Sequence, residues 1–425
     1  MSARSLAART PETDHAMRLS GWLHSLLTAL LVLMVAWRVL LPAVSDRNFG
    51  ITGDSDSGGW SSDFAAILTY AKALWDGSAG YDVASHLRVT SQRAGRPVEH
   101  ALPFGYPPTV LWVLGPFCLL PTQWAFVVWT LLGLAAASWM MRGASIWVTA
   151  AFFSPLAFSC YKLGQTGILS AVGLVALLAR DRAGVGILTS HTGVWMSAFI
   201  LWMLSAKPPV AVTAAVALLA GSSWRPVAWA ALLVVLSLLA LTPHLGVGWV
   251  GDYLRIVTHY DRESANPIFA WGLVPETMSN LRALLHVTFG LGDHMASRIS
   301  SLFWLLALLA IVFSSRGGRI PFEARWGCAV LAYLLFCPHL TSTEDLHLVV
   351  IIIVLSSAAT AVSPLLRSAA MAAIAVALFL ASGLVVATSY RIPAVFALKV
   401  LLLLPMVRIF TMRSAPRPVL AETPP

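Results

Sequence analysis

The chain has 425 residues, of which 58% are hydrophobic and only 11% are charged. Its mean hydropathy is +0.77. A soluble domain carries about twice this charged fraction, so the composition excludes a soluble globular protein and predicts a polytopic membrane protein. The formal net charge of +9 comes largely from arginines scattered in short loops. That distribution is the positive-inside pattern of membrane proteins, and we expect no nucleic-acid partner.

The first apolar run covers residues 21–41 and follows a basic N-terminus. The short sequence Ala43-Val44-Ser45 has some features of a signal-peptide cleavage site. A run of about 20 residues is, however, longer than the roughly 7–15 residues of a signal h-region. We therefore expect a retained membrane helix here, with residues 1–20 as a cytoplasmic tail.

A polar segment follows, and residues 42–105 are predicted to form a large first extracytoplasmic loop that carries interfacial helices. Asp63 begins a stretch with helical periodicity, which Gly77 can end. Asp63 is either a capping acid that interacts favourably with the helix dipole or a functional carboxylate. Asp54-Ser55-Asp56 resembles a metal-binding D-x-D motif, but its Gly- and Ser-rich context favours a solvated loop.

Apolar segments then recur to the end of the chain. They cover residues 106–120, 122–141, 144–160, 167–180, 184–205, 209–222, 227–243, 298–314, 327–338, 347–362, 369–388 and 394–410. The first of these is short and interrupted by prolines. If it does not cross the bilayer, every later basic loop falls on the cytoplasmic side. We therefore predict an all-α bundle of about twelve membrane-spanning helices with residues 106–120 re-entrant and both termini cytoplasmic.

This topology places the richest polar chemistry on the outer face. Lys162, Gln165 and Lys207 lie at helix ends, where the lysines either snorkel or bind a phosphate. His339 and the cluster Glu344-Asp345-Leu346-His347 form either a polar hinge or a site for an anionic group. A second long outer loop spans residues 244–297, and its run His259–Glu263, which includes Tyr260, is either a solvated turn or the rim of an acceptor site.

Several chemistries lack a sequence signal. The four cysteines lie in apolar segments and form no C-x-x-C pair, so we expect buried thiols. The histidines and acids around residues 339–347 match no metal-binding pattern, and no phosphate-binding loop, dinucleotide fingerprint or G-x-S-x-G motif is present. We expect neither a metal nor a cofactor.

The order of several short motifs resembles that of glycosyltransferase family 87, whose members are integral-membrane enzymes of the GT-C superfamily. The matching strings are Asp63-Phe64, Tyr70 to Gly77, Tyr81-Asp82, Phe104 to Pro108 with Leu119-Leu120-Pro121, Gly164-Gln165-Thr166-Gly167, Lys207-Pro208, and Pro338-His339 with Asp345-Leu346. Gly167 stands where the family usually has Asn, and Glu344 where it has Tyr. The resemblance covers residues 20–410, and we treat residues 21–412 as one GT-C-like domain followed by a disordered cytoplasmic tail at 413–425.

The resemblance implies the transfer of a sugar, with inversion, from a polyprenyl-phosphate donor to a glycolipid or lipid-linked glycan. Mannose is the sugar that the family favours. The resemblance also implies that Asp63 is the general base. The expected donor-phosphate ligands are Lys207, His339, His347 and Lys162, and the expected substrate-binding residues are Gln165, Tyr106, Asp345 and Tyr260. The expected location is the inner (plasma) membrane, with the active site on its extracytoplasmic side.

A transporter or flippase of a lipid-linked or anionic substrate is the alternative. Transporters place ionisable residues near the middle of the membrane and often contain inverted repeats. Most apolar segments of this chain are uncharged, and we find no internal repeat.

Overall fold

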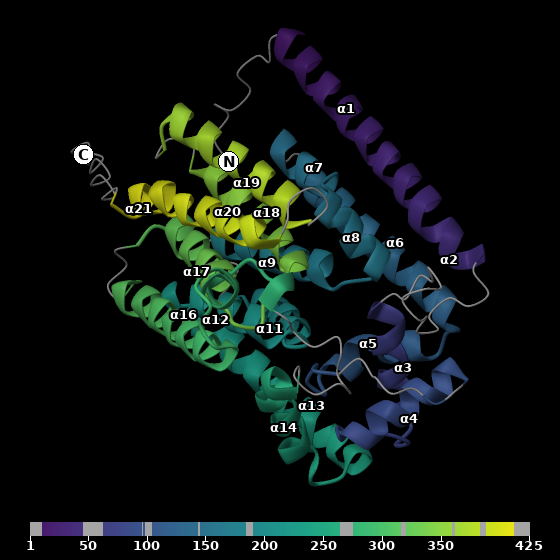
Figure 1. Ribbon diagram of the computed structural model, residues 1–425. Coiled ribbons are helices and arrows are strands. Elements are labelled where there is room, and N and C mark those ends of the chain that lie inside the picture. The colour runs from purple at the N-terminus through teal and green to yellow at the C-terminus, as the bar shows by residue number, and fades with distance from the viewer. Residues whose placement is uncertain are drawn as a thin grey trace.

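The protein is a bundle of α-helices that surround a nearly fully buried centre (Figure 1). The computed structural model describes residues 11–45, 63–95, 97, 104–142, 145–183, 190–263, 275–315, 320–358, 362–382 and 388–411. Helices make up 83% of the structure, and no strand occurs in these ranges. Asp54, Asp56 and the predicted tail at 413–425 lie outside the described residues.

The helices follow the predicted apolar segments closely. They are α1 (Pro11–Val35), the π-helical turn η1 (Ala36–Leu40), α2 (Leu41–Ser45), α3 (Asp63–Trp75), α4 (Val83–Ala94), α5 (Val110–Cys118), α6 (Thr122–Met141), α7 (Ile146–Phe152), α8 (Pro155–Leu163), α9 (Gly167–Arg182), α11 (His191–Leu204), α12 (Pro208–Ala220), α13 (Trp224–Leu245), α14 (Trp249–Glu263), η3 (Pro275–Thr277), α15 (Leu281–Ala283), η4 (Leu284–Thr288), α16 (Asp293–Ser315), α17 (Phe322–Phe336), η5 (Ser342–His347), α18 (Leu348–Ser357), α19 (Pro364–Ala381), α20 (Thr388–Leu401) and α21 (Leu403–Thr411).

Six helical stretches in the described residues are long and apolar enough to cross a membrane. They are Trp22–Ser45, Thr122–Met141, Trp224–Leu245, Asp293–Ser315, Pro364–Ala381 and Thr388–Ile409. The bent pair α7 and α8 would make a seventh span. The prediction of a helical, multi-pass membrane protein is confirmed at this level. The further predicted spans coincide with shorter helices such as α9 and α18.

The first span lies along one edge of the bundle and contacts little of it (Figure 1). Trp22, Leu33 and Trp37 are between 65% and 72% exposed. Large apolar side chains on such a surface indicate contact with lipid tails, whereas in water they would form an aggregation-prone patch. The N-terminal apolar run is therefore a candidate membrane span by its length and its exposed apolar surface.

The helix predicted at Asp63 is α3, and Gly77 follows its end with a φ of 73°. The prediction expected α3 to lie along the membrane interface. In the structure its apolar face is buried in protein, because Phe64 packs with its ring centroid 5.1 Å from that of Trp129 and 6.2 Å from that of Phe117. These contacts fix α3 against α5 and α6.

Helix α5 contains nine residues of the segment predicted to be re-entrant. At 1.5 Å per residue it is about 14 Å long, which is too short to cross a hydrocarbon core of about 30 Å. The short length agrees with a segment that does not span. Pro121 separates α5 from α6, since it is the N-cap of α6 and cannot continue a helix.

Residues 144–160 were predicted as one membrane span, and the structure shows a bent pair of helices in this segment. The segment breaks into α7 and α8, which meet at an angle of 48°. The Ser154 hydroxyl accepts a hydrogen bond from the Ala157 amide at 3.2 Å, so it caps a new helix. Pro155 occupies the first position of that helix, where its missing N–H costs nothing. The bend directs α8 and the loop after it toward α3.

Candidate functional site

The candidate site begins with a hydrogen bond between two residues far apart in the sequence. Gln165, in the turn between α8 and α9, donates from Nε2 to Oδ2 of Asp63 at the start of α3. Burial raises the pKa of Asp63 to about 6, while the hydrogen bond from Gln165 acts in the opposite direction. A carboxylate with a pKa near neutrality is suited to exchange protons with a substrate.

Gly164 brings the turn that carries Gln165 close to α3. It ends α8 with a φ of 66°, in the left-handed region that glycine adopts most readily. A Cβ added at this position would lie 2.4 Å from Cβ of Phe64. The backbone therefore needs glycine here for its conformation and for the close packing that holds Gln165 against Asp63.

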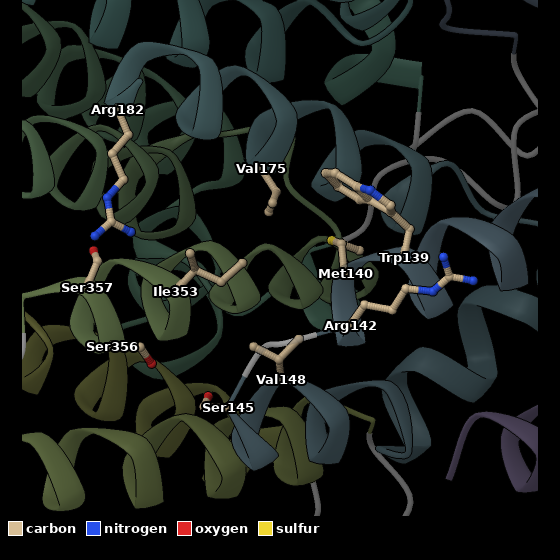
Figure 2. A pocket seen from close by; sticks show the side chains of 10 residues that line it. All are labelled: Trp139, Met140, Arg142, Ser145, Val148, Val175, Arg182, Ile353, Ser356 and Ser357. Carbon is tan, nitrogen blue, oxygen red and sulfur yellow. The ribbon is translucent and has the colours of Figure 1, made fainter. Parts of the chain in front are cut away.

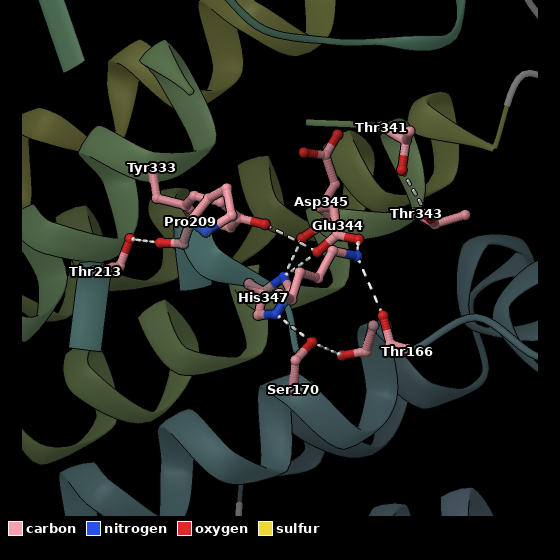
Figure 3. A network of polar contacts seen from close by, with 12 residues as sticks. Thr166, Ser170, Pro209, Thr213, Tyr333, Thr341, Thr343, Glu344, Asp345 and His347 are labelled. Carbon is pink, nitrogen blue, oxygen red and sulfur yellow. Dashed lines mark hydrogen bonds and ion pairs between the residues drawn. The ribbon is translucent and has the colours of Figure 1, made fainter. Parts of the chain in front are cut away.

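Beside this pair lies a network of buried polar contacts centred on Glu344 (Figure 3). Lys207 forms an ion pair with Oε1 of Glu344, and its ammonium also donates to the Thr166 hydroxyl at 3.2 Å. The Tyr333 hydroxyl donates to Oε2 of Glu344 at 2.9 Å. Because Thr166 follows Gln165 directly, the network and Asp63 are joined through one turn of the chain.

His347 completes the network from its buried position at the end of η5. Its Nδ1 lies 2.6 Å from the Glu344 carbonyl oxygen, and its Nε2 lies 2.9 Å from the Ser170 hydroxyl. The carbonyl can only accept, so Nδ1 carries the hydrogen, and in the neutral ring Nε2 accepts from Ser170. His347 is fully buried, so it can influence a ligand only through these neighbours.

Asp345 points into a second buried cluster. Its carboxylate forms an ion pair with Lys399 of α20 at 2.5 Å, and both side chains are fully buried. The Lys399 ammonium also donates to the Ser279 hydroxyl and carbonyl oxygens, each at 2.8 Å. In this arrangement Asp345 connects η5 to α20, and its carboxylate has no exposed surface for a substrate.

The backbone before His339 is held by the second long loop. Asn280 donates to the Cys337 carbonyl oxygen at 2.6 Å, and the buried Arg282 donates to that of Pro338 at 3.0 Å. Arg282 also binds both carboxylate oxygens of Asp293, at 2.8 and 2.7 Å. His339 is half-buried beside these fixed residues.

The structure brings together some of the predicted site residues and separates others. Gln165 contacts Asp63, whereas Lys207 and His347 contact Glu344. Lys162 is exposed at the end of α8. The Tyr106 carbonyl oxygen accepts a hydrogen bond from Tyr81 at 3.1 Å. The side chain of Tyr260, in α14, lies outside the described residues.

Sequence reasoning missed the hydrogen-bond partners Thr166, Ser170, Ser279 and Tyr333, as well as Lys399. A lone lysine in the apolar run 394–410 is a usable signal, because ionisable residues in such segments usually have a buried partner. Single Ser, Thr or Tyr hydroxyls are so common in apolar helices that they do not indicate a polar network. Among the described residues, no three His, Cys, Asp or Glu side chains gather in a way that could hold a metal ion.

Comparison with known proteins identifies no relative. No family model, no curated protein and no solved structure matches this chain. Any functional assignment therefore depends on the chemistry of the residues and on the motif resemblance described above.

Proposed function

We propose that this protein is an integral-membrane glycosyltransferase that transfers a sugar from a polyprenyl-phosphate donor to a hydroxyl of a glycolipid or lipid-linked glycan. The observation that supports this proposal most directly is the carboxylate of Asp63. It lies on a helix too short to span the membrane, its pKa is raised to about 6, and a distant loop holds it through Gln165. Mannose is the sugar that the motif resemblance favours.

In the proposed reaction Asp63 acts as general base. It accepts the proton of the acceptor hydroxyl while that oxygen attacks the anomeric carbon of the donor sugar. The bond from the anomeric carbon to the phosphate oxygen breaks, and the polyprenyl phosphate leaves with the bonding electrons. A single displacement of this kind inverts the anomeric centre. The lipid tail of the donor would remain in the bilayer throughout.

The departing phosphate needs positively charged or hydrogen-bonding groups near it. Lys207 is 19% exposed, and its charge is already partly balanced by Glu344. Of the other candidates, His339 is half-buried and Lys162 is exposed, whereas His347 is fully buried. We propose Lys207 and His339 as the direct phosphate ligands, with His347 acting through Glu344. The GT-C-like arrangement of about twelve spans and an extracytoplasmic site belong to the same proposal.

The proposal is tested by sugar transfer from radiolabelled polyprenyl-phosphate mannose to endogenous acceptors in membranes that contain the protein. We expect Asp63→Asn to reduce the rate by a factor of about 10² or more, the usual contribution of a general base. Asp76→Asn is the matched control, because Asp76 lies just after the same helix, is exposed, and accepts a hydrogen bond from the Ser78 amide. Equal activity of Asp63→Asn and wild type would refute the assignment of the base.

A transporter or flippase is the second candidate, and the buried pair of Lys399 and Asp345 favours it. Lys399 lies within a candidate span, and buried ionisable residues in spans often mark transport pathways. Proteoliposomes that contain a fluorescent polyprenyl-phosphate mannose analogue and a glycolipid acceptor distinguish the two candidates. Protein-dependent translocation of the analogue without any sugar transfer would support the transporter and count against the enzyme.

A further inference from the structure

A cavity of about 610 Å³ opens at the end of the bundle opposite Asp63. It lies between the end of α6, the start of α7, the C-terminal half of α9 and the end of α18 (Figure 2). Helix α9 runs from Gly167, near the candidate site, to Arg182, at the cavity. Its sixteen residues span about 24 Å, and the cavity wall begins at Val175, about halfway along the helix.

The cavity carries positive charge and no negative charge on its walls. Arg142 and Arg182 are both exposed lining residues, and among the described residues no carboxylate lines the cavity. In Figure 2, Arg182 lies beside Ser357 on one side of the cavity, and Arg142 lies on the other side near Trp139. Two guanidinium groups at the edges of one hollow favour an anionic ligand.

Asp181 and Arg180, the charged residues next to Arg182 in the sequence, both contact other residues. Asp181 accepts a hydrogen bond from the Trp326 indole at 2.8 Å and lies 3.5 Å from the guanidinium of Arg325. Arg180 donates to the Ser197 hydroxyl at 3.0 Å and to the Gly193 carbonyl oxygen at 3.2 Å. The Asp181 carboxylate is thus committed to another arginine, which leaves the charge of Arg182 for a ligand.

The remaining walls of the cavity are largely apolar. The Ser145 hydroxyl oxygen is buried and has no hydrogen-bond partner in the described part of the chain. The Ser356 and Ser357 hydroxyls donate to helix carbonyl oxygens at 2.8 and 2.9 Å and so are not donors for an anion. Met140, Val148 and Val175 supply apolar walls, and Trp139, which is 48% exposed, suits a membrane interface.

We propose that this cavity binds the phosphate of an anionic phospholipid headgroup from the leaflet at this end of the bundle. Arg182 and Arg142 attract the anionic headgroup from opposite sides of the cavity, and the acyl chains leave past the apolar wall near Trp139. Basic pockets between membrane helices bind anionic headgroups in this way. The volume is within the range of about 300–1,000 Å³ that is usual for small-molecule sites. The proposal is independent of the glycosyltransferase activity.

The test measures binding of tail-labelled fluorescent phosphatidylglycerol to the delipidated, detergent-solubilised protein. We expect Arg142→Gln with Arg182→Gln to weaken binding at least tenfold. The matched control is Arg225→Gln with Arg367→Gln, which removes the same charge from two arginines that do not line the cavity. Ser356→Phe fills the cavity from its exposed side without changing the charge, and we expect it to weaken binding as well.

Competition distinguishes the possible sources of the phosphate. Unlabelled phosphatidylglycerol should displace the probe, whereas phosphatidylcholine and millimolar inorganic phosphate should not. Equal binding by the cavity double variant and the control double variant would overturn the proposal. Displacement by inorganic phosphate as effective as that by the lipid would also overturn it, because the site would then recognise a soluble anion.

Discussion

Gln165 donates a hydrogen bond to Asp63 across 102 residues of sequence. The contact joins the turn after the broken pair α7 and α8 to the first residue of α3. Burial raises the pKa of Asp63, and Gln165 limits that rise by hydrogen bonding to the charged form. The pair thus holds a carboxylate that changes its charge near neutral pH at a fixed position.

The first prediction concerns stability as a function of pH. The pKa of Asp63 is raised from 3.8 to about 6 in the folded protein, so the folded state binds the proton more tightly than the unfolded state. The stabilisation is complete below pH 4 and is lost as the pH rises through about 6. A difference of about two pH units corresponds to about 3 kcal/mol.

Asp63→Asn should remove this dependence, because the amide does not ionise. We therefore expect the variant to be more stable than wild type at pH 8 and to match it near pH 4. Thermal unfolding in detergent at both pH values measures the difference, and Asp76→Asn serves as the exposed control. A larger stability gain at pH 4 than at pH 8 would contradict the raised pKa.

The second prediction concerns Gln165. Gln165→Leu removes the hydrogen bond that stabilises the charged form of Asp63, so the pKa of Asp63 should rise above about 6. In a sugar-transfer assay the acidic limb of the pH–rate profile should move to higher pH. Gln92→Leu, on the exposed surface of α4, should leave the profile unchanged. If the acidic limb of Gln165→Leu does not shift, Gln165 does not influence the pKa of Asp63.

The sequence predicts the local structure well where that structure depends on residues within a single helix. The periodicity after Asp63 and the glycine at position 77 predict both ends of α3. The predicted span at 144–160 is bent, because the cap at Ser154 and the proline after it begin a new helix inside the apolar run. Local capping outweighs hydrophobicity at that position.

The candidate site is less predictable, because its contacts join distant segments. Lys207 and Glu344 were both noted in the sequence, but nothing in their spacing indicates that they form an ion pair. The pattern of charges in the sequence does not distinguish a lysine that binds a phosphate from a lysine that forms an ion pair with a carboxylate of the protein. The burial of α3 by aromatic rings of α5 and α6 likewise depends on tertiary packing, which periodicity does not encode.

The third prediction compares two glycines with the same backbone conformation. Gly164 and Gly95 both have a φ of 66°, but only at Gly164 would an added Cβ collide with Phe64. Gly95→Ala should cost about 1–2 kcal/mol for the left-handed conformation alone. Gly164→Ala should cost a further 1–3 kcal/mol, roughly, from overpacking. Unfolding of both variants in detergent measures the difference, and equal losses would show that the turn is not tightly packed on α3.

The fourth prediction concerns the buried ion pair of Lys399 and Asp345. Each side chain is fully buried, so removing one leaves an uncompensated charge at a cost of about 3–5 kcal/mol. We expect Lys399→Met and Asp345→Leu each to destabilise strongly. The double variant Lys399→Met with Asp345→Leu should lose less than the sum, because two apolar groups need no partner.

The exposed pair of Arg255 and Asp252 provides the matched comparison for this cycle. Its atoms are 3.4 Å apart, but the side chains are 69% and 40% exposed. Solvent screens such a pair, so Asp252→Asn should change stability by less than about 1 kcal/mol. Denaturation in detergent, followed by far-UV circular dichroism, measures all the variants. Additive losses at Lys399 and Asp345 would show that the two residues stabilise the fold independently. A coupling energy well above that of the exposed pair would instead show that η5 is anchored to α20 through this contact, and with it the backbone that carries Glu344.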